Sequence, residues 1–122
     1  MPQKILYIED NPQSVTLISR WLTGAGYEFF EAYNGADGLA AAEEHQPDLL
    51  LIDINLPDMT GIDIVQRLRA LPAFATKPLV ALTANVRKVD REQYLAAGFT
   101  RHLPKPVTQK ELLNTIKELI DA

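Results

Sequence analysis

DLLLID, at residues 48–53, is the stretch of sequence that decides the fold. Its four consecutive large apolar residues leave no polar face, and such a strand is typical of a parallel sheet that helices cover on both sides. Four other short segments, at 4–8, 27–32, 78–83 and 99–103, have the composition of strands. The sequence therefore predicts a sheet of five strands.

Helical signals occur between these strand segments. Asn11 is suited to cap a helix that begins at Pro12. Helices are also predicted over Gly38–His45, after a turn at 34–35, and over Val86–Ala97. Apolar residues recur at helical spacing in three segments: Val15, Ile18 and Leu22; Ile62, Val65 and Leu68; and Leu112, Ile116 and Leu119. This alternation of strands and helices indicates an α/β fold with a doubly wound parallel sheet and right-handed crossovers.

The composition excludes several classes of protein. The length of 122 residues fits one domain, over residues 1–122, and the absence of cysteine excludes disulfides and thiolate metal sites. Twelve basic and sixteen acidic residues give a net charge of −4, which offers no electrostatic footprint for nucleic acid. No segment has the pattern of a signal peptide or of a membrane span, so we expect a cytoplasmic protein.

Polar side chains stand where the predicted strands end. They are Glu9 and Asp10 after the first strand, Asp53 at the end of the third, Thr83 at the end of the fourth and Lys105 after the fifth. In open α/β sheets, sites form outside the carboxyl ends of the strands. We therefore expect these side chains to converge on one site.

The residue types at this site predict phosphoryl transfer. Three neighbouring carboxylates repel one another, and Mg²⁺ with its preference for oxygen ligands would relieve the repulsion. An ionised Asp53 beside the metal can attack a phosphoryl group in line and form an aspartyl phosphate. Lys105 would neutralise charge on the transferring oxygens, and the hydroxyl of Thr83 could donate to one of them.

Four motifs carry a resemblance to a known family: IEDN at 8–11, DINLPDMTG at 53–61, ALTA at 81–84 and LPKP at 103–106. Along nearly its whole length, the chain resembles a response regulator receiver domain of two-component signalling, of the stand-alone chemotaxis or cell-cycle type. The resemblance implies a flavodoxin-like (βα)5 fold with strand order 2-1-3-4-5. It also implies a signalling domain that assists its own phosphotransfer and slow dephosphorylation rather than a turnover enzyme.

The resemblance assigns roles to individual residues. Asp53 would accept phosphate from a histidine kinase or a histidine phosphotransfer protein. Asp10 and Asp53 would bind Mg²⁺ directly, Glu9 through water, and Asn55 through its backbone carbonyl. The peptide bond Lys105–Pro106 is expected in cis. The protein is expected to act as a monomer or as a phosphorylation-dependent dimer.

In similar domains phosphorylation moves a hydroxyl, here that of Thr83, and a ring on the last strand follows it. His102 stands where tyrosine or phenylalanine is commoner, and we interpret it first as a packing ring, although its charge could couple the switch to pH. Asn55 and Asn85 would flank the phosphate entry route and tune the lifetime of the acyl phosphate. The output surface for a downstream partner is expected to include Val86, Arg87, Asp90, His102, Pro104, Val107 and Thr108.

Other functions and architectures fit the sequence less well. An aspartate-nucleophile phosphatase usually has a second aspartate two residues after the nucleophile, where this chain has Asn55. A nucleotide- or flavin-binding module would need a Gly-rich loop after the first strand, where Asn11, Pro12 and Gln13 stand. The Met1 start favours a stand-alone receiver over one cut from a longer regulator or hybrid kinase.

Four conspicuous side chains have simpler interpretations. Trp21 is expected to be half-buried by packing, and His45 to be solvated near a helix end. Met59 and Phe74 are expected to be exposed in or near loops.

Overall fold

The predicted sheet is confirmed. The computed structural model describes residues 2–84 and 88–120, and its five parallel strands run in the order β2-β1-β3-β4-β5. The strands are β1 (Lys4–Ile8), β2 (Glu28–Ala32), β3 (Leu49–Asp53), β4 (Leu79–Thr83) and β5 (Arg101–Pro104). β3 therefore lies at the centre of the sheet, between β1 and β4.

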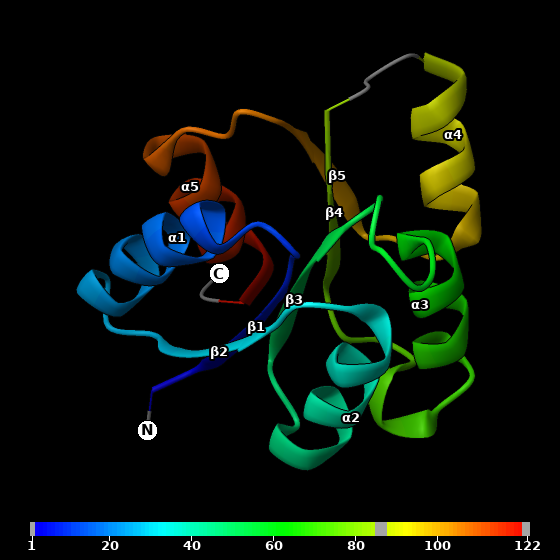
Figure 1. The fold of residues 1–122 in the computed structure, drawn as a ribbon, viewed down its shortest axis with the longest axis horizontal. Helices are drawn as coiled ribbons and strands as arrows, with labels where there is room; N and C mark the ends of the chain where they lie inside the picture. Colours follow the sequence, from blue (N-terminus) through cyan, green and yellow to red (C-terminus); the bar gives the residue numbers. More distant parts are fainter. Residues whose placement is uncertain (1, 85–87, 121–122) are drawn as a thin grey trace.

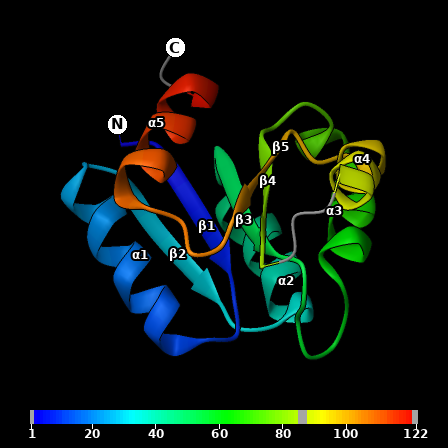
Figure 2. The same cartoon turned by 90° about the horizontal axis from the view of Figure 1, so that it is seen from above.

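Helices cover both faces of this sheet. They are α1 (Pro12–Gly24), α2 (Gly35–His45), α3 (Gly61–Arg69), α4 (Lys88–Ala97) and α5 (Gln109–Ile120), and a short 3-10 helix, η1 (Pro72–Phe74), follows α3. α1 and α5 lie side by side on one face, and α2, α3 and α4 follow one another on the other face (Figures 1 and 2). This is the doubly wound arrangement of a flavodoxin-like fold.

The central strand β3 has all its residues buried. Leu50 and Ile52 pack in a hydrophobic cluster with side chains of α3. Leu49 and Leu51 point to the opposite face and pack in a second cluster with side chains of α1 and α5. Because both faces of the strand are covered, its apolar run cannot shift along the sheet without exposing leucine, and Asp53 is fixed at the sheet edge.

α2 begins at Gly35 rather than at Gly38, so the predicted turn at 34–35 is the start of the helix. The side chain of Asn34 caps it by accepting a hydrogen bond of 2.8 Å from the backbone N–H of Asp37. Met59 lies over the first turn so closely that a Cβ added to Gly35 would meet its Cγ at 2.3 Å. This close packing of Met59 on Gly35 is a feature that a sequence pattern does not distinguish from a turn.

The predicted stripe of α3 is confirmed but incomplete. Ile62 is half-buried and packs against the cluster under α3, Val65 and Leu68 are buried in it, and Ile64 is a further buried residue that the predicted spacing missed. The expected exposure of Phe74, by contrast, is wrong. Phe74 is fully buried, at 0% exposure, because η1 turns it into the cluster under α3.

The remaining conspicuous side chains are half-buried. Trp21 packs against the second cluster, as predicted. His45 ends α2 as predicted, but its ring stacks on Phe30 with centroids 4.0 Å apart, so it is not fully solvated. Met59 is half-buried over Gly35 rather than exposed.

The side chain of Arg69, the last residue of α3, hydrogen-bonds to η1, to the segment before β4 and to the turn before β5. Its Nη1 donates to the carbonyls of Phe74 and Lys77, both at 2.7 Å. Its Nε donates to the carbonyl of Gly98 at 2.9 Å, and Nη2 to Oγ1 of Thr100 at 3.2 Å. None of these acceptors is a carboxylate, and burial lowers the pKa of Arg69. The guanidinium therefore acts as a hydrogen-bonding hub between η1 and the turn that precedes β5.

Replacing this hub should destabilise the fold. Arg69→Met is expected to lower the free energy of unfolding by about 2–4 kcal/mol, because several partly buried carbonyls lose their donor. Arg67→Met is the matched control, since Arg67 is exposed on the same helix, and it should change stability by no more than about 0.5 kcal/mol. Urea unfolding followed by circular dichroism measures both, and equal losses would contradict the role of Arg69.

Candidate functional site

The predicted site residues meet at one edge of the sheet. Glu9 and Asp10 follow β1, Asp53 ends β3, Thr83 ends β4 and Lys105 follows β5. These strands are parallel, so their carboxyl ends lie together. Glu9, Asp53 and Thr83 are 1%, 6% and 2% exposed, whereas Asp10 is exposed. The site is thus a mostly buried polar cluster with one open side.

The ammonium group of Lys105 lies between two of the carboxylates. Its Nζ donates to Oε1 of Glu9 at 2.6 Å and to Oδ1 of Asp53 at 3.2 Å. Burial acts against the charge of Lys105, but the hydrogen bonds and attraction of Glu9 and Asp53 outweigh burial and raise its pKa above the ordinary 10.5. Lys105 therefore supplies a permanent positive charge at neutral pH.

The three carboxylates form a set that fits a divalent cation. One oxygen from each of Glu9, Asp10 and Asp53 lies within 4.8 Å of the others. The set offers only oxygen ligands, which suits Mg²⁺, and one exposed member leaves room for water. Three carboxylates and one ammonium leave two negative charges uncompensated, which is the charge that a divalent cation neutralises.

Tyr7 belongs to this cluster, although sequence reasoning did not find it. It lies on β1 at 1% exposure, and its hydroxyl donates to Oε1 of Glu9 at 3.1 Å. Burial, followed by the charge of Glu9, raises the pKa of Tyr7, so the phenol stays protonated. The signal was the spacing: residues two apart on a strand point to the same side.

The loop after Asp53 is tightly closed. The exposed Asn55 pairs with Thr60 in an isolated antiparallel bridge. A Cβ on Gly61 would lie 2.9 Å from the carbonyl oxygen of Asp53, so only glycine allows α3 to start this close to the strand end. The loop that carries Asn55 is therefore fixed directly beside the site.

Asp58 attaches the same loop to α2. Its two carboxylate oxygens accept hydrogen bonds from the backbone N–H groups of Gly35 at 2.7 Å and Ala36 at 2.9 Å. These two bonds lower the pKa of Asp58. A negative charge at a helix N-terminus is favourable, so Asp58 serves as a second cap for α2.

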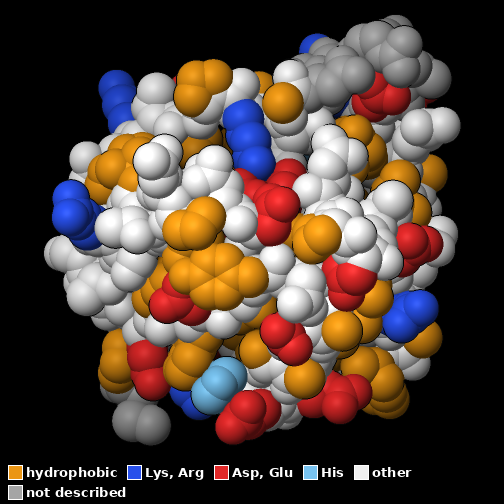
Figure 3. Space-filling model, viewed as in Figure 1, with side chains coloured by type: hydrophobic (Ala, Val, Ile, Leu, Met, Phe, Trp, Pro, Cys, Tyr) orange, Lys and Arg blue, Asp and Glu red, His pale blue; other side chains and the backbone are white. Residues whose placement is uncertain are grey.

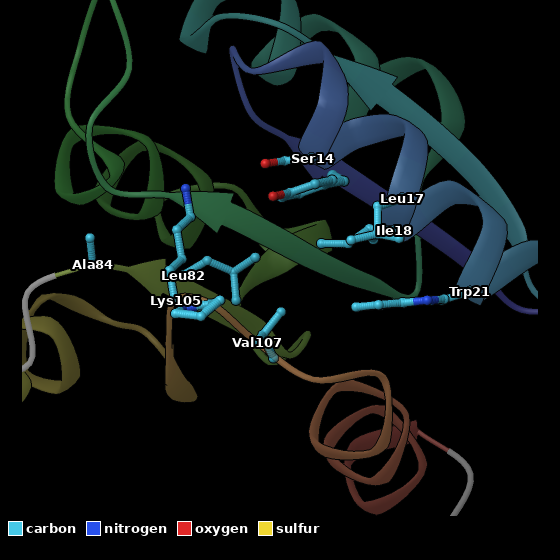
Figure 4. A pocket seen from close by; sticks show the side chains of 10 residues that line it. Ser14, Leu17, Ile18, Trp21, Leu82, Ala84, Lys105 and Val107 are labelled. Atoms are coloured by element: carbon cyan, nitrogen blue, oxygen red, sulfur yellow. The ribbon is translucent and has the colours of Figure 1, made fainter.

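A cavity of about 370 Å³ opens beside Lys105. Figure 4 shows Leu17, Ile18 and Trp21 of α1 on one side of it, with Lys105 and Val107 opposite. The other lining residues are Tyr7, Ser14, Leu82, Ala84 and Pro106. The peptide bond Lys105–Pro106 is cis, as predicted. The stem of Lys105 lines this mainly apolar cavity, and its charged end reaches the carboxylates.

The predicted output surface is described only in part. Its residues Val86 and Arg87 lie outside the described residues, as does Asn85, which was predicted beside the phosphate entry route. Pro104 and Thr108 are exposed, and His102 and Val107 are half-buried. Asp90, expected on this surface, is only 9% exposed in the first turn of α4.

Acidic and basic side chains are interspersed on the face drawn in Figure 3, and the described side chains form no continuous basic patch there. This agrees with the net charge of −4. Within residues 2–84 and 88–120, no helix is both long enough and apolar enough to span a bilayer.

The fold and the acidic cluster together match a known class of protein. The family model described as the response regulator receiver domain matches residues 5–117. The chain therefore belongs to the response regulator receiver domain family, the signalling domain of two-component systems.

Individual relatives share the fold over nearly the whole chain. The polar-differentiation response regulator DivK of Brucella anthropi is 32% identical over 120 residues, 98% of each chain. The chemotaxis response regulator CheY4 of Vibrio cholerae has a TM-score of 0.94 at 29% identity, covering 98% of this chain and 100% of its own.

Other relatives carry the domain within a larger protein. The chain is 36% identical over 116 residues to the transcriptional regulatory protein KdpE of Mycobacterium tuberculosis, and this match covers 95% of the chain but only 50% of KdpE. The receiver domain of the sensor histidine kinase PA1611 of Pseudomonas aeruginosa has a TM-score of 0.91 at 34% identity, with both chains fully covered. That structure has a magnesium ion coordinated in its active-site cleft.

His102 should make stability depend on pH in mild acid. Burial, followed by the charge of Arg91, lowers its pKa below 6.5. Well above pH 6.5 the ring is neutral in the folded and unfolded chain alike. As the pH falls, the unfolded chain binds the proton first, because its His102 has the higher pKa. The free energy of unfolding therefore decreases between the pKa of His102 in the unfolded chain and its lower pKa in the folded chain.

Wild type is therefore expected to lose more stability than His102→Phe between about pH 7.5 and about pH 5.5. Urea unfolding at both pH values measures the difference, and the carboxylates common to both proteins cancel in the comparison. Parallel pH profiles for the two proteins would show that His102 does not titrate as its surroundings indicate.

Proposed function

We propose that this protein is a phosphoryl-accepting receiver in a two-component phosphorelay, with Asp53 as the acceptor. The observation that carries the proposal is the position of Lys105, whose ammonium is shared by Asp53 and Glu9 at 3.2 and 2.6 Å. This countercharge stands beside three carboxylates that fit Mg²⁺. The carboxylates of Glu9, Asp10 and Asp53 and the backbone carbonyl of Asn55 would hold the metal, which when bound supplies positive charge to the phosphoryl oxygens.

The transfer itself needs little from the protein beyond position and charge. A carboxylate oxygen of Asp53 attacks the phosphorus in line and forms the new O–P bond. The P–N bond to the donor histidine breaks, and the nitrogen keeps the electron pair and takes a proton from solvent. Lys105 neutralises charge on the transferred group, and the hydroxyl of Thr83, at the end of the neighbouring strand, donates to one of its oxygens.

Occupancy of Asp53 then selects between two packings of the same fold. Thr83 moves toward the phosphoryl group and His102, on the adjacent strand β5, follows it. The face of α4, β5 and α5 changes as a result, and a downstream protein binds it. The lowered pKa of His102 keeps the ring neutral near pH 7, which favours the packing role over a pH-coupled switch.

The proposal also covers the domain organisation, the oligomeric state and the phosphodonor. Residues 1–122 act as a single cytoplasmic domain, a monomer or a phosphorylation-dependent dimer, without direct contact to nucleic acid or membrane. The phosphodonor is a histidine kinase or a histidine phosphotransfer protein. Asp53 stores the phosphoryl group rather than turning it over, because the neutral amide of Asn55 stands where an aspartate-nucleophile phosphatase has its acid and base.

Intact-mass measurement tests the acceptor. After incubation with acetyl phosphate and Mg²⁺, wild type is expected to gain the mass of one phosphoryl group, and Asp53→Asn none, because the amide is not a nucleophile. Omitting Mg²⁺ should abolish the gain.

The matched control for this test is Asp48→Asn. Asp48 directly precedes β3, remote from the site, and accepts a hydrogen bond from the backbone N–H of Lys4, so this variant should be phosphorylated as wild type is. Equal gain by the Asp53 variant would overturn the proposal. Sustained multiple turnover of a small phosphomonoester would favour the phosphatase instead.

A further inference from the structure

The hydroxyl of Tyr7 has no role in the proposed phosphoryl transfer. It is buried on β1, and it does not belong to the carboxylate set that fits the metal. Its hydrogen bond of 3.1 Å ends on Oε1 of Glu9, the same oxygen that accepts the ammonium of Lys105 at 2.6 Å. One carboxylate oxygen therefore holds a fixed neutral donor and a movable charged one.

The lengths of these two bonds show how the donors share the oxygen. A hydroxyl bound to a carboxylate usually lies about 2.5–2.7 Å from it, so the bond of Tyr7 is long. Lys105 takes the stronger bond, and the phenol is the weaker partner while the ammonium is present. If Lys105 moved away, the phenol of Tyr7 could shorten its hydrogen bond, and Oε1 of Glu9 would keep a donor.

Lys105 has to move in this way if it serves the transferred group. Its Nζ lies closer to Glu9 than to Asp53, by 2.6 against 3.2 Å. Negative charge on the phosphoryl oxygens would draw the ammonium away from Glu9. The carboxylate of Glu9 is only 1% exposed, so it would then lose a charged donor that water cannot replace. A buried carboxylate oxygen that loses its donors is costly.

We propose that Tyr7 is a positioning residue that releases Lys105 for phosphoryl transfer by remaining hydrogen-bonded to Glu9 when the ammonium leaves. The inference rests on the proposed function and adds a residue to it. The backbone N–H of Asp10 holds the other oxygen, Oε2, at 3.1 Å, so Glu9 keeps its orientation throughout. Without the phenol, Lys105 stays bound to Glu9 and assists Asp53 less.

The test compares rates of phosphorylation by acetyl phosphate, in which Asp53 forms the O–P bond and acetate leaves with its electron pair. At saturating Mg²⁺, Tyr7→Phe is expected to react about tenfold more slowly than wild type, the effect of losing one hydrogen bond to a charged group. Tyr27→Phe is the matched control, since Tyr27 is a buried tyrosine at the opposite end of the same hydrophobic cluster. It should react at the wild-type rate.

A double-mutant cycle separates positioning from a general loss of structure. In a Glu9→Gln background, the ion pair between Glu9 and Lys105 is absent, so Tyr7 has nothing from which to release Lys105. Adding Tyr7→Phe should then change the rate of phosphorylation by less than about twofold. Thermal unfolding and calorimetric Mg²⁺ titration of each variant give its folding and metal affinity independently.

Two results would overturn the role of Tyr7: a Tyr7→Phe variant that reacts as fast as wild type at saturating Mg²⁺, or full slowing by Tyr7→Phe in the Glu9→Gln background. Failure of the proposed function looks different, because wild type itself would then take up no phosphate.

Discussion

Three carboxylates crowded at the end of a sheet repel one another, and the site exists only because positive charge offsets that repulsion. Two unit charges about 5 Å apart, at an effective dielectric constant of about 20, repel by about 3 kcal/mol. Asp53 cannot relax away, because the apolar run before it is buried on both faces. Lys105 offsets part of the repulsion, and the remainder makes the site attractive to a divalent cation.

The fold fixes the position of Asp53 at the centre of the sheet, whereas Thr83 and Lys105 lie nearer to the edge that β5 forms. Asp53 ends the central strand, and Gly61 and Asp58 fix the loop behind it. Thr83 and Lys105 belong to β4 and to the segment after β5, and β5 is an edge strand. Under the proposed function, Thr83 and Lys105 would therefore carry a change in charge at Asp53 toward the edge of the sheet.

Sequence alone predicted the five strands and brought the acidic, hydroxyl and amino groups to one edge, because strand ends in a parallel sheet must lie together. It failed where packing decides. Asn34 and Gly35 look like a turn, yet Met59 and a side-chain cap make them a helix start. Phe74 follows a helix-ending proline and looks exposed, yet η1 buries it. Tyr7 looked like core in an apolar run; its spacing of two residues from Glu9 was the only signal in the sequence, and the hydrogen bond to Glu9 establishes its polar role.

The contacts of Lys105 also bear on how long a phosphoryl group would last. Hydrolysis of an acyl phosphate is accelerated by a base that activates water. Among the described residues, Glu9 already accepts two side-chain donors on one oxygen and a backbone donor on the other. Asn55 is an exposed amide and cannot take a proton. Neither residue therefore offers a free base to an attacking water, which supports the proposal that Asp53 stores the phosphoryl group.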